Sequence, residues 1–181
     1  MYDPAAAIPV EEARKQILIS VERLAMLYSH FAETLVSELG EERGKELIRK
    51  AIAAYGTEVG QRQRNRVTQA GRAASCENYK AVPDLPTLAW SPDGMPQIVR
   101  GGKKIAVCPL AKYWIERGAT ATELGRLYCY VDQAKYATFD PACECRHLEN
   151  VLDGDDRCSV VAKKKSEWAE LDGAAAPQAN Q

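Results

Sequence analysis

The chain begins with two long stretches in which hydrophobic residues recur at helical spacing. In the first, from Pro9 to Leu39, apolar side chains return every three or four residues: Ile17, Val21, Leu24, Tyr28, Phe31 and Leu35, with Leu18, Ala25, Ala32 and Leu39 widening the stripe. This period predicts an amphipathic helix, and Gly40 stands where a glycine commonly ends one. A long apolar stripe needs a partner surface, either in the core or on a second copy of the chain. We therefore expect a homo-oligomer, and an internal core helix is the alternative.

The second helical stretch runs from Glu41 to about Arg64 and contains two glycines, Gly56 and Gly60. Residues four apart lie on one helical face, and each glycine is less favourable there than alanine by about 1 kcal/mol. The pair therefore predicts a close approach on that face by another helix or by a ligand. Together the two stretches give a helical part over residues 9–72.

Residues 73–101 show no sustained period. Four prolines and Gly94 interrupt them, and Trp90 is the one large apolar anchor. A long connection without regular structure is uncommon in a compact domain and is often functional. We therefore predict a lid or binding loop over this range.

Shorter elements follow in the second half of the chain. The pattern predicts a strand, two helices and a hairpin whose two strands flank an Asp/Gly turn; their ranges are Lys103–Val107, Lys112–Arg117, Glu123–Tyr136, Cys145–Val151 and Cys158–Lys163. The predicted fold class is α+β, with N-terminal helices packed on a small antiparallel sheet and a further helix. We expect one domain over residues 1–168, with the sheet and the site in 102–165, and a disordered tail over 169–181.

Composition narrows the function classes. The chain is 46% hydrophobic and 27% charged with a net charge of −1, and a nucleic-acid partner is not expected without excess positive charge. No apolar run reaches the length of about 18 residues that a membrane helix needs. The opening residues lack the pattern of a secretory signal. We therefore expect a cytoplasmic protein that acts on a small molecule and whose cysteines stay reduced.

Cys108 is the first candidate for chemistry. It falls between the predicted strand and helix, and Pro109 suits the first position of a helix. A thiol at a helix N-terminus feels the positive end of the helix dipole, which can lower its pKa. Cys108 is therefore a candidate nucleophile, although a buried core cysteine fits the same pattern.

Only two histidines are present, so few groups can carry acid–base chemistry near neutral pH. His30 lies among polar positions of the first helix and is interpreted as solvated surface. His147 lies on the predicted hairpin, on the same strand face as Cys145 and Glu149. We expect it to approach Cys158 across the hairpin and to share a polar pocket with Asp132.

A series of short motifs resembles a known family. The motifs are Tyr55-Gly56 with Gly60, Cys108-Pro109, Leu124-Gly125 with Tyr128-Cys129 and Asp132, Phe139-Asp140-Pro141, and Gly154-Asp155 with Cys158. In their order and spacing, over residues 10–163, the chain is similar to the L-2-amino-thiazoline-4-carboxylic acid hydrolase-like family. The resemblance implies a hydrolase that opens a small heterocycle at a carbon bonded to nitrogen. It places Cys108, Asp132, Asp155 and Cys158 on motif positions.

These observations lead to one predicted site. Cys108 is the expected nucleophile and His147 the proton shuttle, and Asp132 or Asp155 is expected to orient His147 or to bind the ring nitrogen of the substrate. The candidate substrate-binding residues are Tyr55, Trp90, Tyr128 and Asp155. No cofactor is expected in this mechanism.

The hairpin also resembles the end of the four-vinyl-reductase type ligand-binding domain, in which cysteines can hold zinc. That resemblance implies an alternative zinc site, with the ligands Cys129, Asp132, His147 and Cys158. Asn150 stands where a further cysteine is expected, which departs from the four N/S ligands of structural zinc. The rival function is therefore a non-catalytic sensor module that binds zinc or a small molecule.

Overall fold

The computed structural model describes residues 7–91 and 93–175 and has the predicted α+β fold. Its helices are α1 (Val10–Leu39), α2 (Glu41–Gln69), the 3₁₀ helix η1 (Cys76–Ala81), α3 (Thr87–Trp90), α4 (Pro109–Arg117), α5 (Ala119–Tyr128), α6 (Val131–Phe139) and α7 (Lys165–Ala175). The strands are β1 (Gln97–Arg100), β2 (Lys103–Ala106), β3 (Cys143–Glu149) and β4 (Ser159–Lys164). They form two separate antiparallel hairpins, β1–β2 and β3–β4. No described helix combines the length and the apolar character needed to cross a membrane.

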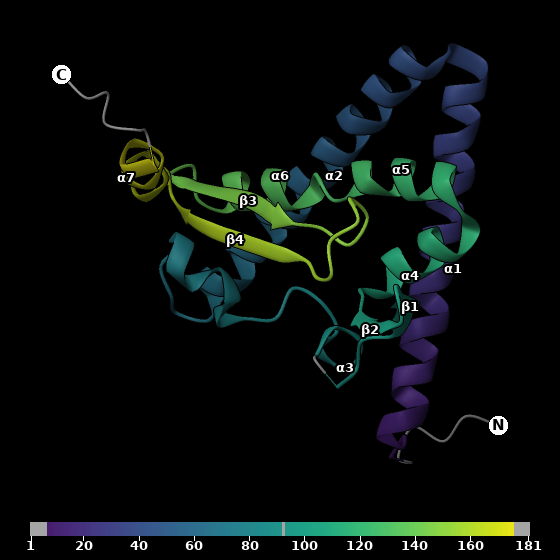
Figure 1. Cartoon of the computed structure of the whole chain (residues 1–181). Helices are drawn as coiled ribbons and strands as arrows, with labels where there is room; N and C mark the ends of the chain where they lie inside the picture. The colour runs from purple at the N-terminus through teal and green to yellow at the C-terminus, as the bar shows by residue number, and fades with distance from the viewer. Residues whose placement is uncertain (1–6, 92, 176–181) are drawn as a thin grey trace.

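The two long helices meet at one end as a helical hairpin (Figure 1). Gly40 joins them with a φ of 77°, a conformation that favours glycine. The buried face of α1 is centred on small residues such as Ala25 and Ala32, which let neighbouring helices come close. The predicted stripe is buried in part: Val21, Ala25 and Ala32 lie in the core, whereas Phe31 is 64% exposed and Leu24 is exposed too. The homo-oligomer stays a prediction.

The paired glycines of α2 mark the contact between α2 and α6. A side-chain carbon on Gly56 would lie 2.7 Å from the Val131 carbonyl oxygen, and one on Gly60 would collide with that of Lys135. The close approach predicted for this face is thus made by a helix. It brings α6, which carries Asp132, firmly against the long helical hairpin.

The segment 73–101 is more ordered than predicted. It contains η1, α3 and β1, so the description of this range as a loop without regular structure is wrong. A disulfide bond between Cys76 and Cys143 ties η1 to β3. The expectation that all cysteines stay reduced is therefore wrong for this pair. Tertiary contacts, which a periodicity analysis does not include, order this segment.

The predicted helix over 123–136 is two helices. The backbone N–H of Cys129 bonds to the carbonyl of Arg126, and that of Tyr130 bonds to the carbonyl of Leu127. These bonds to the residue three positions earlier tighten the last turn and separate α5 from α6.

The β3–β4 hairpin has the predicted position, and His147 pairs with Val160. The disordered tail predicted for 169–181 is wrong for residues 169–175, which belong to α7. Trp168 holds this helix because its ring is buried and its Nε1 donates a hydrogen bond to the Glu144 carbonyl at 3.0 Å. The predicted range 176–181 lies outside the described residues.

The largest core cluster surrounds Trp114 on α4. Its ring is 1% exposed, and its Nε1 donates to the Ala25 carbonyl of α1 at 3.3 Å. Tyr28 on the same side of α1 donates to the Leu124 carbonyl of α5 at 2.7 Å. The α4–α5 pair is thereby fixed against α1, and α5 forms the wall between the two pockets described below.

Candidate functional site

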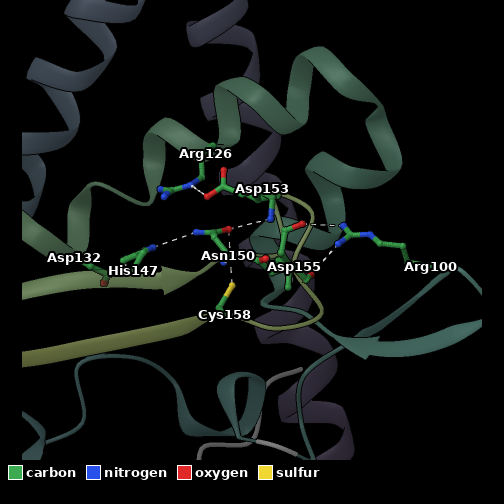
Figure 2. Close-up of polar contacts among 10 residues, drawn as sticks. Arg100, Arg126, Asp132, His147, Asn150, Asp153, Asp155 and Cys158 are labelled. Carbon is green, nitrogen blue, oxygen red and sulfur yellow. Dashed lines mark hydrogen bonds and ion pairs between the residues drawn. The ribbon is translucent and has the colours of Figure 1, made fainter. Parts of the chain in front are cut away.

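A chain of polar side chains links α6 to β3 and to the loop after it. His147 Nε2 lies 2.9 Å from Asp132 Oδ2, and Asn150 Nδ2 lies 3.1 Å from His147 Nδ1. Figure 2 shows the three side chains in line at the end of the β3–β4 hairpin. The His147 side chain is 4% exposed, and Asn150 is 1% exposed. The expected contact between His147 and Asp132 is present, and Asn150 is the hydrogen-bond partner of the other ring nitrogen, Nδ1.

Asn150 determines where the His147 proton lies. Its Oδ1 accepts a hydrogen bond from the Leu152 backbone N–H at 2.9 Å and lies 3.9 Å from Cys158 Sγ. The amide group Nδ2 must then donate to His147 Nδ1. The imidazole therefore carries its proton on Nε2 and donates it to Asp132. The predicted direct approach of His147 to Cys158 is not present. Asn150 lies between the two side chains and contacts both.

Lys135 continues the chain on the other side of Asp132. Its Nζ lies 2.8 Å from Asp132 and 2.9 Å from Asp84, and the residue is 7% exposed. Burial acts to raise the pKa of Asp132, but the His147 hydrogen bond and the Lys135 charge outweigh it and hold the pKa below its usual range. Asp132 is therefore an ionised carboxylate that orients His147.

Cys108 lies at the helix start, as predicted, and its Sγ accepts a hydrogen bond from the Ala111 backbone N–H at 3.3 Å. The predicted lowering of its pKa is wrong. Burial raises the pKa of the Cys108 thiol to about 12, more than the hydrogen bonds from Ala111 and Leu110 lower it. The loss of hydration outweighs the helix terminus here, so the thiol stays protonated near neutral pH.

The other free thiols differ in how well a ligand can reach them. Burial raises the pKa of Cys129 to about 11, although Asn150 and Arg126 oppose it. Cys145 is buried, and burial raises its pKa to about 12. Cys158 alone among the free cysteines is exposed, and its raised pKa is opposed by a Val151 backbone hydrogen bond and by Arg126. Cys158 is the thiol most open to a substrate.

The four candidate zinc ligands do not assemble into a metal site. Within residues 7–91 and 93–175, no three His, Cys, Asp or Glu side chains are placed to share a metal ion. Both His147 nitrogens already have partners in Asp132 and Asn150. The donor set therefore does not fit bound zinc, and we derive no step through a metal.

Asp155 has a structural role in the loop after β3. Its carboxylate accepts a hydrogen bond from the Asn150 backbone N–H at 2.6 Å. Arg100 donates to the carbonyls of Asp155 and Val151, each at 2.8 Å, and so ties the β1–β2 hairpin to this loop. Asp155, proposed as a substrate-binding residue, lines neither of the two pockets below.

Two pockets have residues of α5 in their linings. The first, which we call the apolar pocket, has a volume of about 560 Å³ and includes Tyr55, Trp90 and Tyr128 in its lining. The structure thus brings together three of the four residues predicted to bind substrate. Leu110 also lines it, two residues after Cys108.

The second, which we call the cationic pocket, has a volume of about 390 Å³. Its lining includes Lys45, Arg49, Glu123, Arg126, Leu152 and Asp153. None of these residues was a sequence candidate. Its last two residues belong to the loop that also holds Asn150 and ends at Cys158.

Three residues of the site escaped the sequence analysis: Arg126, Lys135 and Asn150. On a helical pattern, a lone Arg or Lys is typical of a solvated surface, and Asn150 stood out only because a cysteine was expected there. A usable signal existed for Arg126. It precedes Cys129 by three residues, which places the two side chains on one helical face.

A family model described as L-2-amino-thiazoline-4-carboxylic acid hydrolase matches residues 20–161. The match confirms the resemblance inferred from the motifs. It spans most of the chain, from α1 into β4, and includes the whole polar chain from Asp84 to Cys158. Comparison with curated proteins and with solved structures found no match.

Proposed function

The chain belongs to the L-2-amino-thiazoline-4-carboxylic acid hydrolase family, and from this premise we propose that it opens a ring C–N bond of a small heterocyclic acid. The reactive centre is the thiol of Cys158 beside Asn150, with His147 and Asp132 behind it. The observation that carries this proposal is the hydrogen-bonded chain Asp132–His147–Asn150, which ends at the one exposed thiol.

The proposed nucleophile differs from the one predicted by sequence. Cys108 is capped by a backbone N–H and its pKa is raised to about 12 by burial. Cys158 is exposed and lies in the same loop as two lining residues of the cationic pocket. Accessibility and the Asn150 contact therefore favour Cys158.

The proposed reaction has two steps. The Cys158 sulfur adds to the ring carbon between the heteroatoms, and the thiol proton passes to the ring nitrogen, so the C=N bond becomes a single bond. This C–N bond then breaks as the exocyclic amine forms a C=NH bond to the same carbon and gives up one proton, which the ring nitrogen takes as it leaves as a primary amine. Water then attacks the same carbon, the bond from that carbon to the Cys158 sulfur breaks, and the thiol regains a proton. The net change is the addition of one water. Asn150 keeps the sulfur oriented, and the His147–Asp132 pair keeps the amide of Asn150 in one orientation.

The test compares three single variants on 2-amino-thiazoline-4-carboxylate. Cys158→Ser should lower the turnover number by at least about 10³-fold, because serine is a far weaker nucleophile at neutral pH. Cys108→Ser and Cys129→Ser are the matched controls and should stay within about 10-fold of the wild type. Product mass, increased by one water, and release of a primary amine report the C–N opening. A free product thiol would instead report opening of the C–S bond.

His147→Gln separates orientation from folding. If His147 holds Asn150 in place, turnover should fall by roughly 10²-fold or more while stability changes by about 1–2 kcal/mol. Wild-type turnover in a folded Cys158→Ser protein would refute the proposal that Cys158 is the nucleophile. Loss of turnover only in Cys108→Ser would restore the residue predicted from sequence.

A further inference from the structure

The lining of the cationic pocket contains three cations, Lys45, Arg49 and Arg126, and two carboxylates, Glu123 and Asp153. Lys45 is paired with Glu41 and Glu123, and Arg126 pairs through Nε with Asp153 at 2.8 Å. Arg49 makes no ion pair with any residue of the described ranges, although it lines the pocket. Arg49 is therefore the cation of this lining that no carboxylate of the described residues pairs with.

Arg126 also has unused hydrogen-bond donors. Its Nη1 is buried and has no partner among residues 7–91 and 93–175, because the one hydrogen bond of the guanidinium uses Nε. One face of the group lies over the Tyr130 ring, with 5.6 Å from Cζ to the ring centroid. A buried donor without an acceptor is costly, and such a group in a native protein commonly indicates a missing water or ligand.

The position of Arg126 connects this pocket to the reactive centre. Figure 2 shows its guanidinium next to the Asp153 carboxylate, with the Asn150 side chain drawn below them. Leu152 lines the pocket, and its backbone N–H donates to Asn150 Oδ1 at 2.9 Å. An anion held in this pocket would therefore lie beside the amide that contacts Cys158.

We propose that the cationic pocket binds the carboxylate of the substrate, with Arg126 as its principal donor and Arg49 as the second charge. This inference rests on the proposed function and names the group by which that site selects its substrate. A guanidinium with free Nη groups matches the planar geometry of a carboxylate, which a lysine does not. The apolar side of the same pocket, at Leu152, would face the ring.

The experiment measures binding without turnover. The probe is thiazolidine-4-carboxylate, which has the ring and the acid but no C=N carbon to attack, and its carboxamide serves as the uncharged comparison. Calorimetric titration of the wild-type protein should show affinity for the acid at least about 10-fold higher than for the carboxamide, the value of a hydrogen bond to a charged group. Acetate and phosphate are added as competitors to show whether the ring is needed.

Four variants assign the effect to the pocket. Arg126→Gln should lower the affinity for the acid by roughly 10- to 100-fold, and Arg49→Gln by a smaller factor. Asp153→Asn removes the same ion pair but keeps the guanidinium, so it should bind the acid as well as or better than the wild type. Arg62→Gln is the surface control, since Arg62 lies on the same helix as Arg49 and pairs only with exposed Glu58.

The outcomes separate this inference from the proposed function. Equal affinity for acid and carboxamide, or equal losses in Arg126→Gln and Asp153→Asn, would overturn the inference even if the ring is hydrolysed. Arg126-dependent binding in a protein without turnover would support the inference and overturn the hydrolase. Displacement by acetate or phosphate at the concentration of the probe would show a general anion site and overturn selection of a heterocyclic acid.

Discussion

The two pockets that flank α5 have opposite chemistry. The apolar pocket is lined mainly by aromatic and aliphatic side chains from α1 to α5, whereas the charged side chains of the cationic pocket come from α2, α5 and the loop after β3. Tyr128 faces the first and Arg126 faces the second. Residues two apart on a helix point in nearly opposite directions. A single helix therefore serves two environments. Three of the four sequence candidates for substrate binding line the apolar pocket, and the fourth, Asp155, lines neither pocket.

Lys135→Met should cause the largest loss of stability, and this loss should affect the wall of the apolar pocket. The change leaves Asp132 and Asp84 buried without their shared cation, and Asp84 precedes Leu85 and Pro86 of the apolar pocket. Removal of one partner of a buried ion pair lowers the free energy of unfolding by about 3–5 kcal/mol. Chemical denaturation measures this loss. Lys50→Met, at an exposed position of α2, is the control and should change stability by less than about 0.5 kcal/mol. Equal effects of the two variants would mean that the Lys135 contacts add no stability.

Gly125→Ala comes next and tests the wall that both pockets share. A methyl group on Gly125 would overlap the ring of Trp114, and overpacking of this kind costs about 1–3 kcal/mol. Gly173→Ala is the matched control, because it is a helical glycine with open space around it, and it should stabilise the protein slightly. A Gly125→Ala protein with wild-type stability would show that α5 can move away from α4.

The sequence predicted those parts of the fold that depend on local pattern. Gly40 between two helices, Gly56 and Gly60 on one face, and the Asp/Gly turn of the hairpin each demand a particular backbone or contact, so their positions were recognised correctly. The predicted stripe of α1 included Ala25 and Ala32, which are buried, and also Phe31, which is exposed. Periodicity gives the apolar face of a helix, but it does not tell which of the large residues on that face lie in the core of the chain.

The sequence also predicted only a part of the candidate site. His147 was found because histidine is scarce in the chain. Asp132 and Tyr128 were found because they stand in the family motifs, and Trp90 because it is the large apolar anchor of its segment. Arg126, Lys135 and Asn150 have common residue types, and their roles come from long-range packing. The pKa of Cys108 shows the same limit, since a helix start can be read from sequence but the burial that outweighs it cannot.

Asp132→Asn should lower the stability of the fold by an intermediate amount, and this loss should depend on pH. The folded protein holds the pKa of Asp132 below its usual range, so this carboxylate contributes stability above the ordinary Asp pKa of about 3.9 and loses that contribution as the pH falls through the lower folded value. At pH 7 the variant should be less stable by about 1–3 kcal/mol.

Because the variant has no carboxylate to protonate at this position, its deficit should shrink as both proteins are acidified below about pH 4. Denaturant titrations from pH 7 to pH 2.5 measure this difference. Asp156→Asn, at an exposed pair with Lys103, is the control. A deficit that stays constant with pH would show that the ionised form of Asp132 is not the one that stabilises the fold.

Trp90→Ala should have the smallest effect on the affinity for thiazolidine-4-carboxylate, and it tests which of the two pockets binds this acid. Trp90 lines the apolar pocket from α3 and makes none of the contacts of the polar chain. If the carboxylate binds at Arg126, the affinity for thiazolidine-4-carboxylate should change by less than about 3-fold, which is the size of a remote effect. Binding of a hydrophobic dye should fall in the same variant, because an indole is removed from the wall of the apolar pocket. Both are measured by titration on one protein sample. A loss of acid binding of 10-fold or more, together with an unaffected Arg126→Gln protein, would assign the substrate to the apolar pocket and restore Tyr55, Trp90 and Tyr128 as its binding residues.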